Sequence, residues 1–427
     1  MSSNAPLITR LAEEISHNTG IITECLKSHG LPQPSFDADS PSHPIPETDE
    51  KMSSARSALI EATKALNALA VGPGEAIRFF GYQEGFLLAS MQVLCHFQVP
   101  QSVPLRGEIS FSELSHKTGL NEAHLARFLR MVITSYYFVE PRPGFVAHTA
   151  KSKILATDNK MRRCVWFRFA ELLPTAGKFI EAVEKYPDST DPQDTAFALA
   201  FGDTFWKHKE KHPDDMLRFG QFMDAWTSGY VVDPPPSVAQ AYHWETLEKG
   251  SLVVDIGGSL GHVSVAIAQE HPHLLFQIQD FEDLKTKSAA LAKENGLEGR
   301  ISFVPHDFFS KQPAKGAKIY FLRNILHNWS DLYCRRILKP LVEAMGPDSR
   351  IVVCDVVLPE PNTMHKTQEV LTRTMDMTMW ALFNAKERSV EEWQELFASV
   401  DGRLKIEKVI GRPKLRVDCM IELKLLE

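Results

Sequence analysis

The sequence predicts an α/β protein in which an open, mostly parallel sheet with helices on both faces follows a helical N-terminal region. From about residue 252 onward, short apolar runs of strand length alternate with segments of helix length, the rhythm that builds parallel sheets. Before that point, apolar residues recur mainly at helical spacing. The chain has 427 residues, more than one ordinary core needs, so we expect two domains plus an extension.

The first 50 residues are expected to form one amphipathic helix and a polar linker. Between about residues 5 and 29, leucines and isoleucines recur on one helix face. The linker, residues 31–50, is rich in Pro, Ser and Asp, which predicts an extended surface segment. Two more helices are expected over residues 55–70 and 76–97, because a Val-Gly-Pro-Gly sequence between them should end the first of the two.

Residues 109–149 have the pattern of a helix-turn-helix followed by a two-stranded wing. Ser112 is predicted to cap a short helix that ends at Gly119, and Asn121 to cap the second helix. Two short apolar runs around the Glu-Pro-Arg-Pro sequence predict the wing. Phosphate contacts normally supply most of the affinity for DNA, and the second helix offers few cations. We therefore expect a packing or dimerisation role.

The region between about residues 160 and 230 is rich in aromatic residues at helical spacing. These rings either form a helical core or wall an apolar substrate pocket, and the sequence leaves both readings open. The chain is thus divided into four segments: an N-terminal helix and linker (1–50), a winged-helix dimerisation domain (51–160), a helical connecting region around the substrate pocket (161–245) and the sheet domain (246–427).

The sheet domain is expected to contain five strands with helices between them, followed by a C-terminal hairpin on the sheet edge. The expected strands are residues 251–257, 274–280, 300–307, 317–323 and 350–359.

Composition limits the classes of partner. The formal net charge is -7, which argues against a nucleic-acid partner and against an anionic membrane surface. No N-terminal signal segment or bilayer-spanning apolar stretch is recognisable, and the six cysteines lack C-x-x-C spacing. No His/Asp cluster has metal-ligand spacing, so no metal is expected. We expect a cytoplasmic protein.

A glycine turn and two later aspartates predict a nucleoside site. In VVDIGGSLGH, Gly257 and Gly258 follow a buried strand, but the spacing fails G-x-G-x-x-G, which argues against a dinucleotide. Asp280 ends the next strand, where a carboxylate can accept the hydroxyls of a ribose. Asp307 and Phe308 follow the third strand, suited to an exocyclic amine and an adenine face. Together these suit a nucleoside without phosphates, such as S-adenosylmethionine.

Six segments in this order resemble caffeate-type O-methyltransferases of plants and, more closely, their fungal relatives in secondary metabolism: VVDIGGSLGH, QIQDFED, HDFF, FLRNILHNWSD, IVVCDVVLP and NAKERSVEEW. The resemblance covers the helical N-terminal extension, the winged-helix dimerisation domain and the whole sheet domain. It implies a Rossmann-like class I methyltransferase sheet domain, an N-terminal helical and winged-helix dimerisation domain, a homodimer and a small aromatic substrate. It also assigns the cofactor residues: Gly257 and Gly258 beside methionine and ribose, Asp280 at the ribose hydroxyls, Asp307 and Phe308 at adenine, and Arg323 nearby.

A lone histidine is more often structural than catalytic, but the resemblance implies that His327 is the general base. A phenol has a pKa near ~10, and an imidazole titrating near ~6.5 can accept its proton at cellular pH. The two supporting carboxylates of the family match Asp355 and Glu387. Asp355 lies within an apolar strand, where an unpaired carboxylate would be costly. Asn328 stands where plant members usually have Asp, which questions any role in the proton chain.

The apolar stretch RTMDMTMWALFN lies where the family has its substrate-facing helix, so Met375 and Met379 are candidate substrate contacts. Three alternatives stay open. The same fold and cofactor can serve a pericyclase or cyclase, the winged helix could serve a DNA-binding regulator, and the chain could be a catalytically silent scaffold partner.

Overall fold

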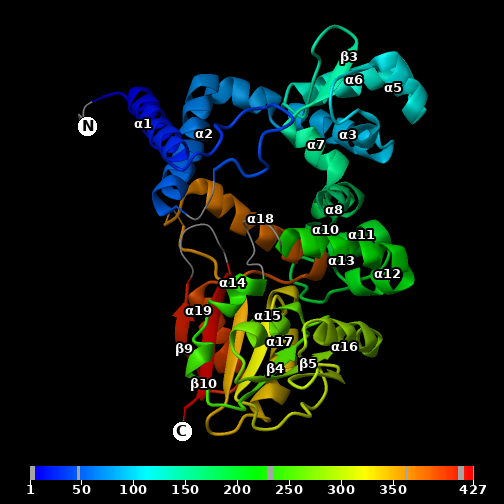
Figure 1. Cartoon of the computed structure of the whole chain (residues 1–427). Helices are drawn as coiled ribbons and strands as arrows, with labels where there is room; N and C mark the ends of the chain where they lie inside the picture. Colours follow the sequence, from blue (N-terminus) through cyan, green and yellow to red (C-terminus); the bar gives the residue numbers. More distant parts are fainter. Residues whose placement is uncertain (1–4, 46–48, 228–234, 362, 412–417, 427) are drawn as a thin grey trace. The chain divides into compact units, whose positions relative to one another are not determined.

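The computed structural model describes residues 5–45, 49–227, 235–361, 363–411 and 418–426 (Figure 1). The chain divides into two compact units. The first contains Met1–Glu171, Arg218–Phe222 and His365–Thr367, and the second contains the remaining chain, including the strands of the sheet domain. Within the described ranges, no helix is both long and apolar enough to cross a membrane.

The first unit begins with α1 (Leu7–Ser28), as expected, and α2 (Glu50–Phe79). The expected break at Val-Gly-Pro-Gly is confirmed: Gly72, with φ of 73° and ψ of 163°, is non-helical, so α2 consists of two helical segments that meet at a kink. A helix can resume directly at Pro73, because the first turn of a helix needs no N–H donor there. The expected helix over residues 76–97 is interrupted at Gly81, whose φ of 71° is left-handed, and α3 (Tyr82–His96) follows.

The polar linker lies on the helix-turn-helix segment of its own chain. Phe36 stacks on the Tyr136 ring with centroids 4.2 Å apart and an interplanar angle of 7°. Asp37 forms an antiparallel bridge with Thr149. The ring stacking and the backbone bridge together fix the position of this linker segment against the helix-turn-helix segment.

The helix-turn-helix elements are present, with one cap corrected. The first helix begins two residues earlier than expected, because Ser110 and not Ser112 accepts the Glu113 N–H, at 3.1 Å. Gly119, with φ of 73°, and Asn121, which accepts the Ala123 and His124 N–H groups, act as predicted. The two expected wing strands pair antiparallel, and a third short strand joins them in the order β1-β3-β2. The elements are α4 (Val99–Ser102), β1 (Ile109–Ser110), α5 (Phe111–Thr118), α6 (Glu122–Ile133), β2 (Phe138–Val139), β3 (Phe145–His148), α7 (Ala150–Thr157) and α8 (Asn159–Phe167).

The aromatic region is helical, and part of it is core. Phe197 and Phe205 are fully buried, and the Phe205 ring packs edge-on against Phe383 at 5.0 Å. The elements of this region are η1 (Arg168–Leu172, a π-helical turn), α9 (Leu173–Ala176), α10 (Phe179–Lys185), α11 (Ala196–Phe201), α12 (Phe205–Lys211), α13 (Pro213–Thr227), α14 (Pro235–Ala239) and η2 (Trp244–Thr246).

The second unit is built on a seven-stranded sheet in the order β6-β5-β4-β7-β8-β10-β9. Every neighbouring pair from β6 to β8 is parallel, and β10 pairs antiparallel with both β8 and β9, so the predicted C-terminal hairpin is present at the edge. The elements are β4 (Leu252–Ile256), α15 (His262–Glu270), β5 (Leu275–Asp280), η3 (Glu282–Leu284), α16 (Lys285–Glu294), β6 (Ile301–Pro305), β7 (Ile319–Arg323), η4 (Leu326–Asn328), α17 (Asp331–Val342), β8 (Arg350–Val356), α18 (Lys366–Phe383), α19 (Val390–Val400), β9 (Leu404–Ile410) and β10 (Asp418–Leu425).

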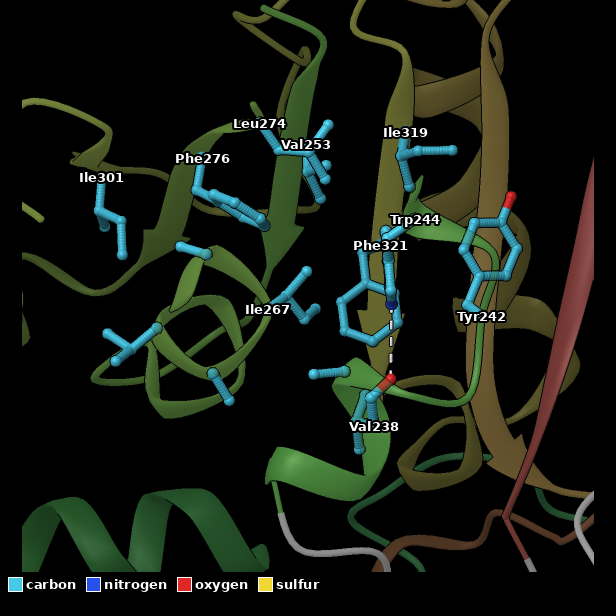
Figure 2. Close-up of a cluster of buried hydrophobic side chains, with 14 of the residues drawn as sticks. Val238, Tyr242, Trp244, Val253, Ile267, Leu274, Phe276, Ile301, Ile319 and Phe321 are labelled. Carbon is cyan, nitrogen blue, oxygen red and sulfur yellow. Dashed lines mark hydrogen bonds between the residues drawn. The ribbon is translucent and has the colours of Figure 1, made fainter. Parts of the chain in front are cut away.

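Side chains alternate between two cores, one on each face of the sheet. On β7, Ile319 and Phe321 pack into the core beside α15 that Figure 2 shows, where Trp244 donates to the Val238 carbonyl at 3.5 Å. Tyr320 and Leu322 point to the opposite core, which α17 and α19 cover. Both faces are therefore buried, as in other parallel sheets, and the carboxyl ends of β4 to β8 share one edge.

Candidate functional site

The glycine turn after β4 is too crowded for side chains. Gly257 has a left-handed φ of 69°, and a Cβ there would lie 2.6 Å from the Ile325 Cδ1 atom. A Cβ on Gly258 would lie 2.5 Å from the Asp255 carboxyl carbon. The backbone at both positions therefore stays bare, which lets a ligand approach it closely.

Asp280 stands at the carboxyl end of β5 with both oxygens oriented by backbone. One oxygen accepts the Ser259 N–H and the other accepts the Phe281 N–H, each at 2.8 Å. Burial raises the pKa of Asp280, and these two bonds oppose the effect. Each oxygen retains acceptor capacity, as a pair of ribose hydroxyls requires.

The third predicted cofactor element lies beside the glycine turn. The Phe308 ring is 4.0 Å from the position that a Gly257 Cβ would occupy, and it packs edge-on against Trp329 at 6.0 Å. Asp307 is exposed, and its Oδ1 accepts the Phe309 N–H at 2.9 Å. The fold thus brings together residues predicted from two separate motifs.

Asp255, within β4, is a residue that the sequence reasoning missed. It is buried, and its Oδ2 accepts a 2.6 Å hydrogen bond from the Ser264 hydroxyl. Burial raises its pKa to about 6, while Ser264 and the charge of Arg323 lower it. Arg323, the last residue of β7, therefore acts electrostatically on this carboxyl beneath the glycine turn. A single acid inside the apolar run VVDIG was the available signal.

His327 lies in the short turn η4 at the carboxyl edge and is buried. Its Nδ1 is 3.0 Å from the Oε1 of Glu387, which is also buried. A carboxylate only accepts, so the imidazole donates its Nδ1 proton. Two residues that are sixty positions apart in the sequence are thereby joined.

Asn328, the departure from the family pattern, has a structural contact. Its side-chain amide donates to the Asn324 carbonyl at 2.8 Å, and Asn324 has a left-handed φ of 53°. An ionised aspartate has no proton to donate there. The asparagine therefore stabilises the turn that carries His327.

Asp355 lies in β8, fully buried at the same edge of the sheet. Just beyond it, Val357 pairs in parallel with Arg388, and the Leu358 N–H donates to the Arg388 carbonyl at 2.8 Å. This pairing brings the Glu387 segment alongside the end of β8.

The predicted substrate helix is α18, and it is joined to the same segment. Asp376 accepts the Glu387 N–H at 3.0 Å, and burial raises the pKa of Asp376. Met375 and Met379 are almost fully buried, and Met375 packs against Val356, next to Asp355. The two methionines thus come from a helix that contacts the candidate catalytic residues.

The site contains two more residues that no motif singled out, Asp376 and Arg388. Their signals were an acid inside an apolar helix and a cation directly after the candidate Glu387. Among the described residues, no group of three or more His, Cys, Asp or Glu side chains could hold a metal ion.

The chain is similar to known O-methyltransferases. Residues 183–401 match the model of the O-methyltransferase domain. The O-methyltransferase bik3 of Gibberella fujikuroi is 37% identical over 408 residues, which are 93% of this chain and 89% of that protein. The structure of OxaC in complex with SAH and oxaline is 21% identical with a TM-score of 0.75, over 97% of this chain and 100% of OxaC. The structure of a pericyclic reaction enzyme is 21% identical in sequence with a TM-score of 0.74, over 97% of this chain and 100% of that enzyme.

The oriented Asp280 carboxylate and the bare glycine turn fit the nucleoside of S-adenosylmethionine, the expected cofactor of such enzymes. Matching motifs, sheet order and sequence identity over nearly the whole length lead to one conclusion: this chain is an enzyme of the O-methyltransferase family.

Proposed function

We propose that the enzyme transfers the methyl group of S-adenosylmethionine to a phenolic hydroxyl of an aromatic secondary metabolite of the polyketide type. The observation that carries this proposal is the buried pair of His327 and Glu387, 3.0 Å apart at the carboxyl edge of the sheet. Gly257, Gly258 and Asp280 would hold the cofactor, with Asp307, Phe308 and Arg323 beside them.

His327 acts as the general base in this proposal. With its Nδ1 proton donated to Glu387, the imidazole carries its lone pair on Nε2, the atom that would accept the phenolic proton. S-adenosylmethionine, when bound, supplies an electrophilic methyl group on sulfur. Positioned base catalysis of this kind contributes about 10²–10⁴ in rate. Asp355 and Glu387 stabilise the imidazolium that forms, and Met375 and Met379 orient the aromatic ring.

The test uses S-adenosylmethionine with a labelled methyl group and a panel of polycyclic phenols. Label should enter the organic extract with the wild type and fall by about 10²-fold or more in His327→Ala. His271→Ala is the matched control, because the His271 side chain makes a hydrogen bond to the Ala239 carbonyl, 3.3 Å away, and lies before β5, outside the residues proposed for the site. Equal transfer by His327→Ala would remove the proposed base.

A pericyclase is the second candidate, supported by the likeness in fold to a pericyclic reaction enzyme. A pericyclic step needs no general base, so the buried His327–Glu387 pair favours methyl transfer. Mass spectrometry separates the two functions: methyl transfer adds the mass of one methylene group, whereas a pericyclic isomerisation leaves the mass of the substrate unchanged.

We further propose a homodimer formed through the first unit, whose helix-turn-helix segment would be a winged helix used for packing. Ile77, Phe80 and Tyr82 are 79%, 89% and 64% exposed, which is unusual for neighbouring large apolar side chains. DNA binding is disfavoured, because Arg130 of α6 forms two hydrogen bonds with Glu140. Light scattering should give the mass of a dimer.

The six free cysteines fit a reducing, cytoplasmic location.

A further inference from the structure

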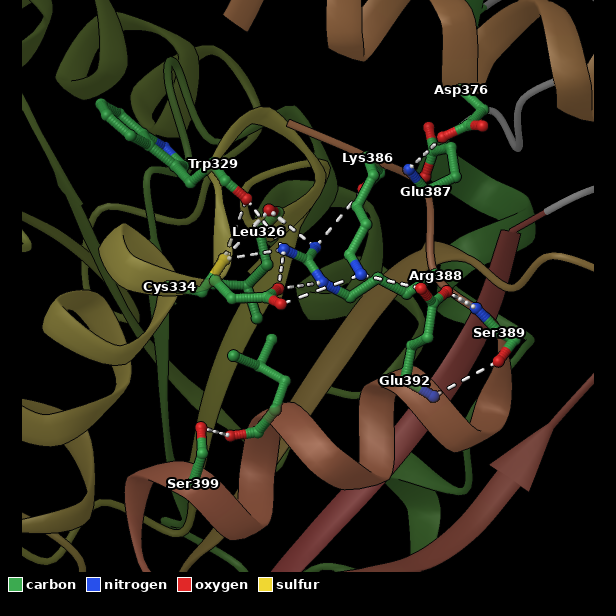
Figure 3. Close-up of polar contacts among 12 residues, drawn as sticks. Leu326, Trp329, Cys334, Asp376, Lys386, Glu387, Arg388, Ser389, Glu392 and Ser399 are labelled. Atoms are coloured by element: carbon green, nitrogen blue, oxygen red, sulfur yellow. Dashed lines mark hydrogen bonds and ion pairs between the residues drawn. The ribbon is translucent and has the colours of Figure 1, made fainter. Parts of the chain in front are cut away.

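Arg388, directly after Glu387, is a fully buried cation that reaches the carbonyls of Leu326 and Trp329 (Figure 3). Its Nη1 donates to the Leu326 carbonyl at 3.3 Å, and its Nη2 donates to the Trp329 carbonyl at 2.9 Å. These two carbonyls flank His327 on either side in the sequence. One guanidinium therefore holds the backbone of the turn before and after the imidazole.

The charge of Arg388 is balanced by the first residue of α17. Asp331 Oδ1 accepts hydrogen bonds from Nε and Nη2 at 2.9 and 2.8 Å. The guanidinium also lies over the Trp393 ring, 5.0 Å from its centroid. A buried arginine is tolerated when its donors are satisfied in this way, and removing it leaves buried groups without their partners.

Few other contacts hold the turn η4 in place: the Asn328 side-chain amide donates to the Asn324 carbonyl, and the Trp329 N–H donates to the Leu326 carbonyl at 3.1 Å. The element is a single 3-10 turn of three residues, and such short turns are held weakly by their own hydrogen bonds. The Cys334 sulfur also lies 3.2 Å from both the Leu326 and the Trp329 carbonyl oxygens. A thiol has one weakly donating proton, so it cannot satisfy both carbonyls.

We propose that Arg388 is a positioning residue that keeps the His327 imidazole within hydrogen-bond distance of Glu387. Glu387 and Arg388 are consecutive, so one short segment contacts the ring of His327 and the backbone on both sides of it. Lysine cannot replace arginine here, because a single ammonium group lacks the planar fork that reaches two carbonyls and a carboxylate together. This inference rests on the proposed role of His327, but its geometry can be tested without a methyl acceptor.

The test is proton NMR of the full-length protein bound to S-adenosylhomocysteine. A buried imidazole N–H that donates to a carboxylate should give a far-downfield signal that exchanges slowly with water, and Glu387→Gln identifies it by removing the carboxylate. We expect this signal in the wild type and its loss in Arg388→Met and in Arg388→Lys. The matched control is Arg300→Met, because Arg300 also donates to backbone carbonyls, those of Ala268, His271 and Leu274.

The kinetic counterpart uses any phenol that the wild type methylates. In Arg388→Lys, kcat should fall at least about tenfold, since small displacements of a base are costly, while KM for S-adenosylmethionine stays within about twofold. Arg300→Met should lower the melting temperature without lowering kcat. A downfield signal that persists unchanged in Arg388→Lys, or that is missing from the wild type, overturns the inference. A signal that behaves as expected in a protein that methylates no phenol overturns the proposed function alone.

Discussion

Replacing Glu387 by glutamine tests how much the carboxylate contributes to proton transfer. Glutamine keeps the size of the side chain and an oxygen that can accept the His327 Nδ1 proton. It removes the negative charge that lies 3.0 Å from that nitrogen. The difference between the two side chains is felt mainly after His327 becomes positively charged, so the loss should appear in kcat rather than in cofactor binding.

The magnitude follows from the distance. Unit charges 3.0 Å apart attract by about 5 kcal/mol at an effective dielectric constant of about 20. The retained neutral hydrogen bond offsets about 1 kcal/mol of the loss. A net loss of about 3 to 4 kcal/mol in the transition state corresponds to a fall of roughly 10²–10³ in kcat.

The assay is single-turnover transfer of a labelled methyl group, with cofactor affinity measured separately by calorimetry. Glu395→Gln is the matched control, because Glu395 is an exposed residue of α19, near Glu387 in the sequence. A Glu387→Gln rate within about threefold of the wild type would refute the electrostatic reasoning, since it would mean that the charge contributes less than about 1 kcal/mol.

Three further predictions concern the cofactor side. Gly258→Ala should lower the free energy of unfolding, measured in urea, by about 1–3 kcal/mol, because its Cβ would lie 2.5 Å from the buried Asp255 carboxyl carbon. The control is Gly299→Ala, which should leave this free energy unchanged, because a Cβ at Gly299 would have no atom within 4 Å. Asp280→Asn loses one acceptor for a backbone N–H and should weaken S-adenosylhomocysteine binding about tenfold or more by calorimetry. Burial raises the pKa of Asp255 from 3.8 to about 6, so the folded state binds its proton more tightly than the unfolded chain does. Its contribution to stability should therefore grow by about 1.4 kcal/mol as pH falls from 7 to 5, and Asp255→Asn should abolish that part of the urea-unfolding pH dependence.

The sequence predicted features that depend on neighbouring residues. Asn121 and Gly119 end helices through contacts within a few residues, so their roles were readable directly. The strands of the sheet were readable too, because apolar runs of strand length alternate with helical segments. Val-Gly-Pro-Gly was readable as a helix break, whereas the break at the left-handed Gly81 was missed, because a lone glycine in a helical pattern gives no distinctive signal.

Only the tertiary structure decided which side chains meet. The sequence alone placed His327 and Glu387 in separate motifs, and their 3.0 Å contact exists because parallel strands bring their carboxyl ends to one edge. The position of Arg388 directly after Glu387 was only a weak signal, since a cation beside a glutamate is usually a surface residue. Its burial and its bonds to the turn around His327 result from the pairing of its segment with the end of β8. Long-range contacts of this kind depend on the whole sheet, and no local pattern records them.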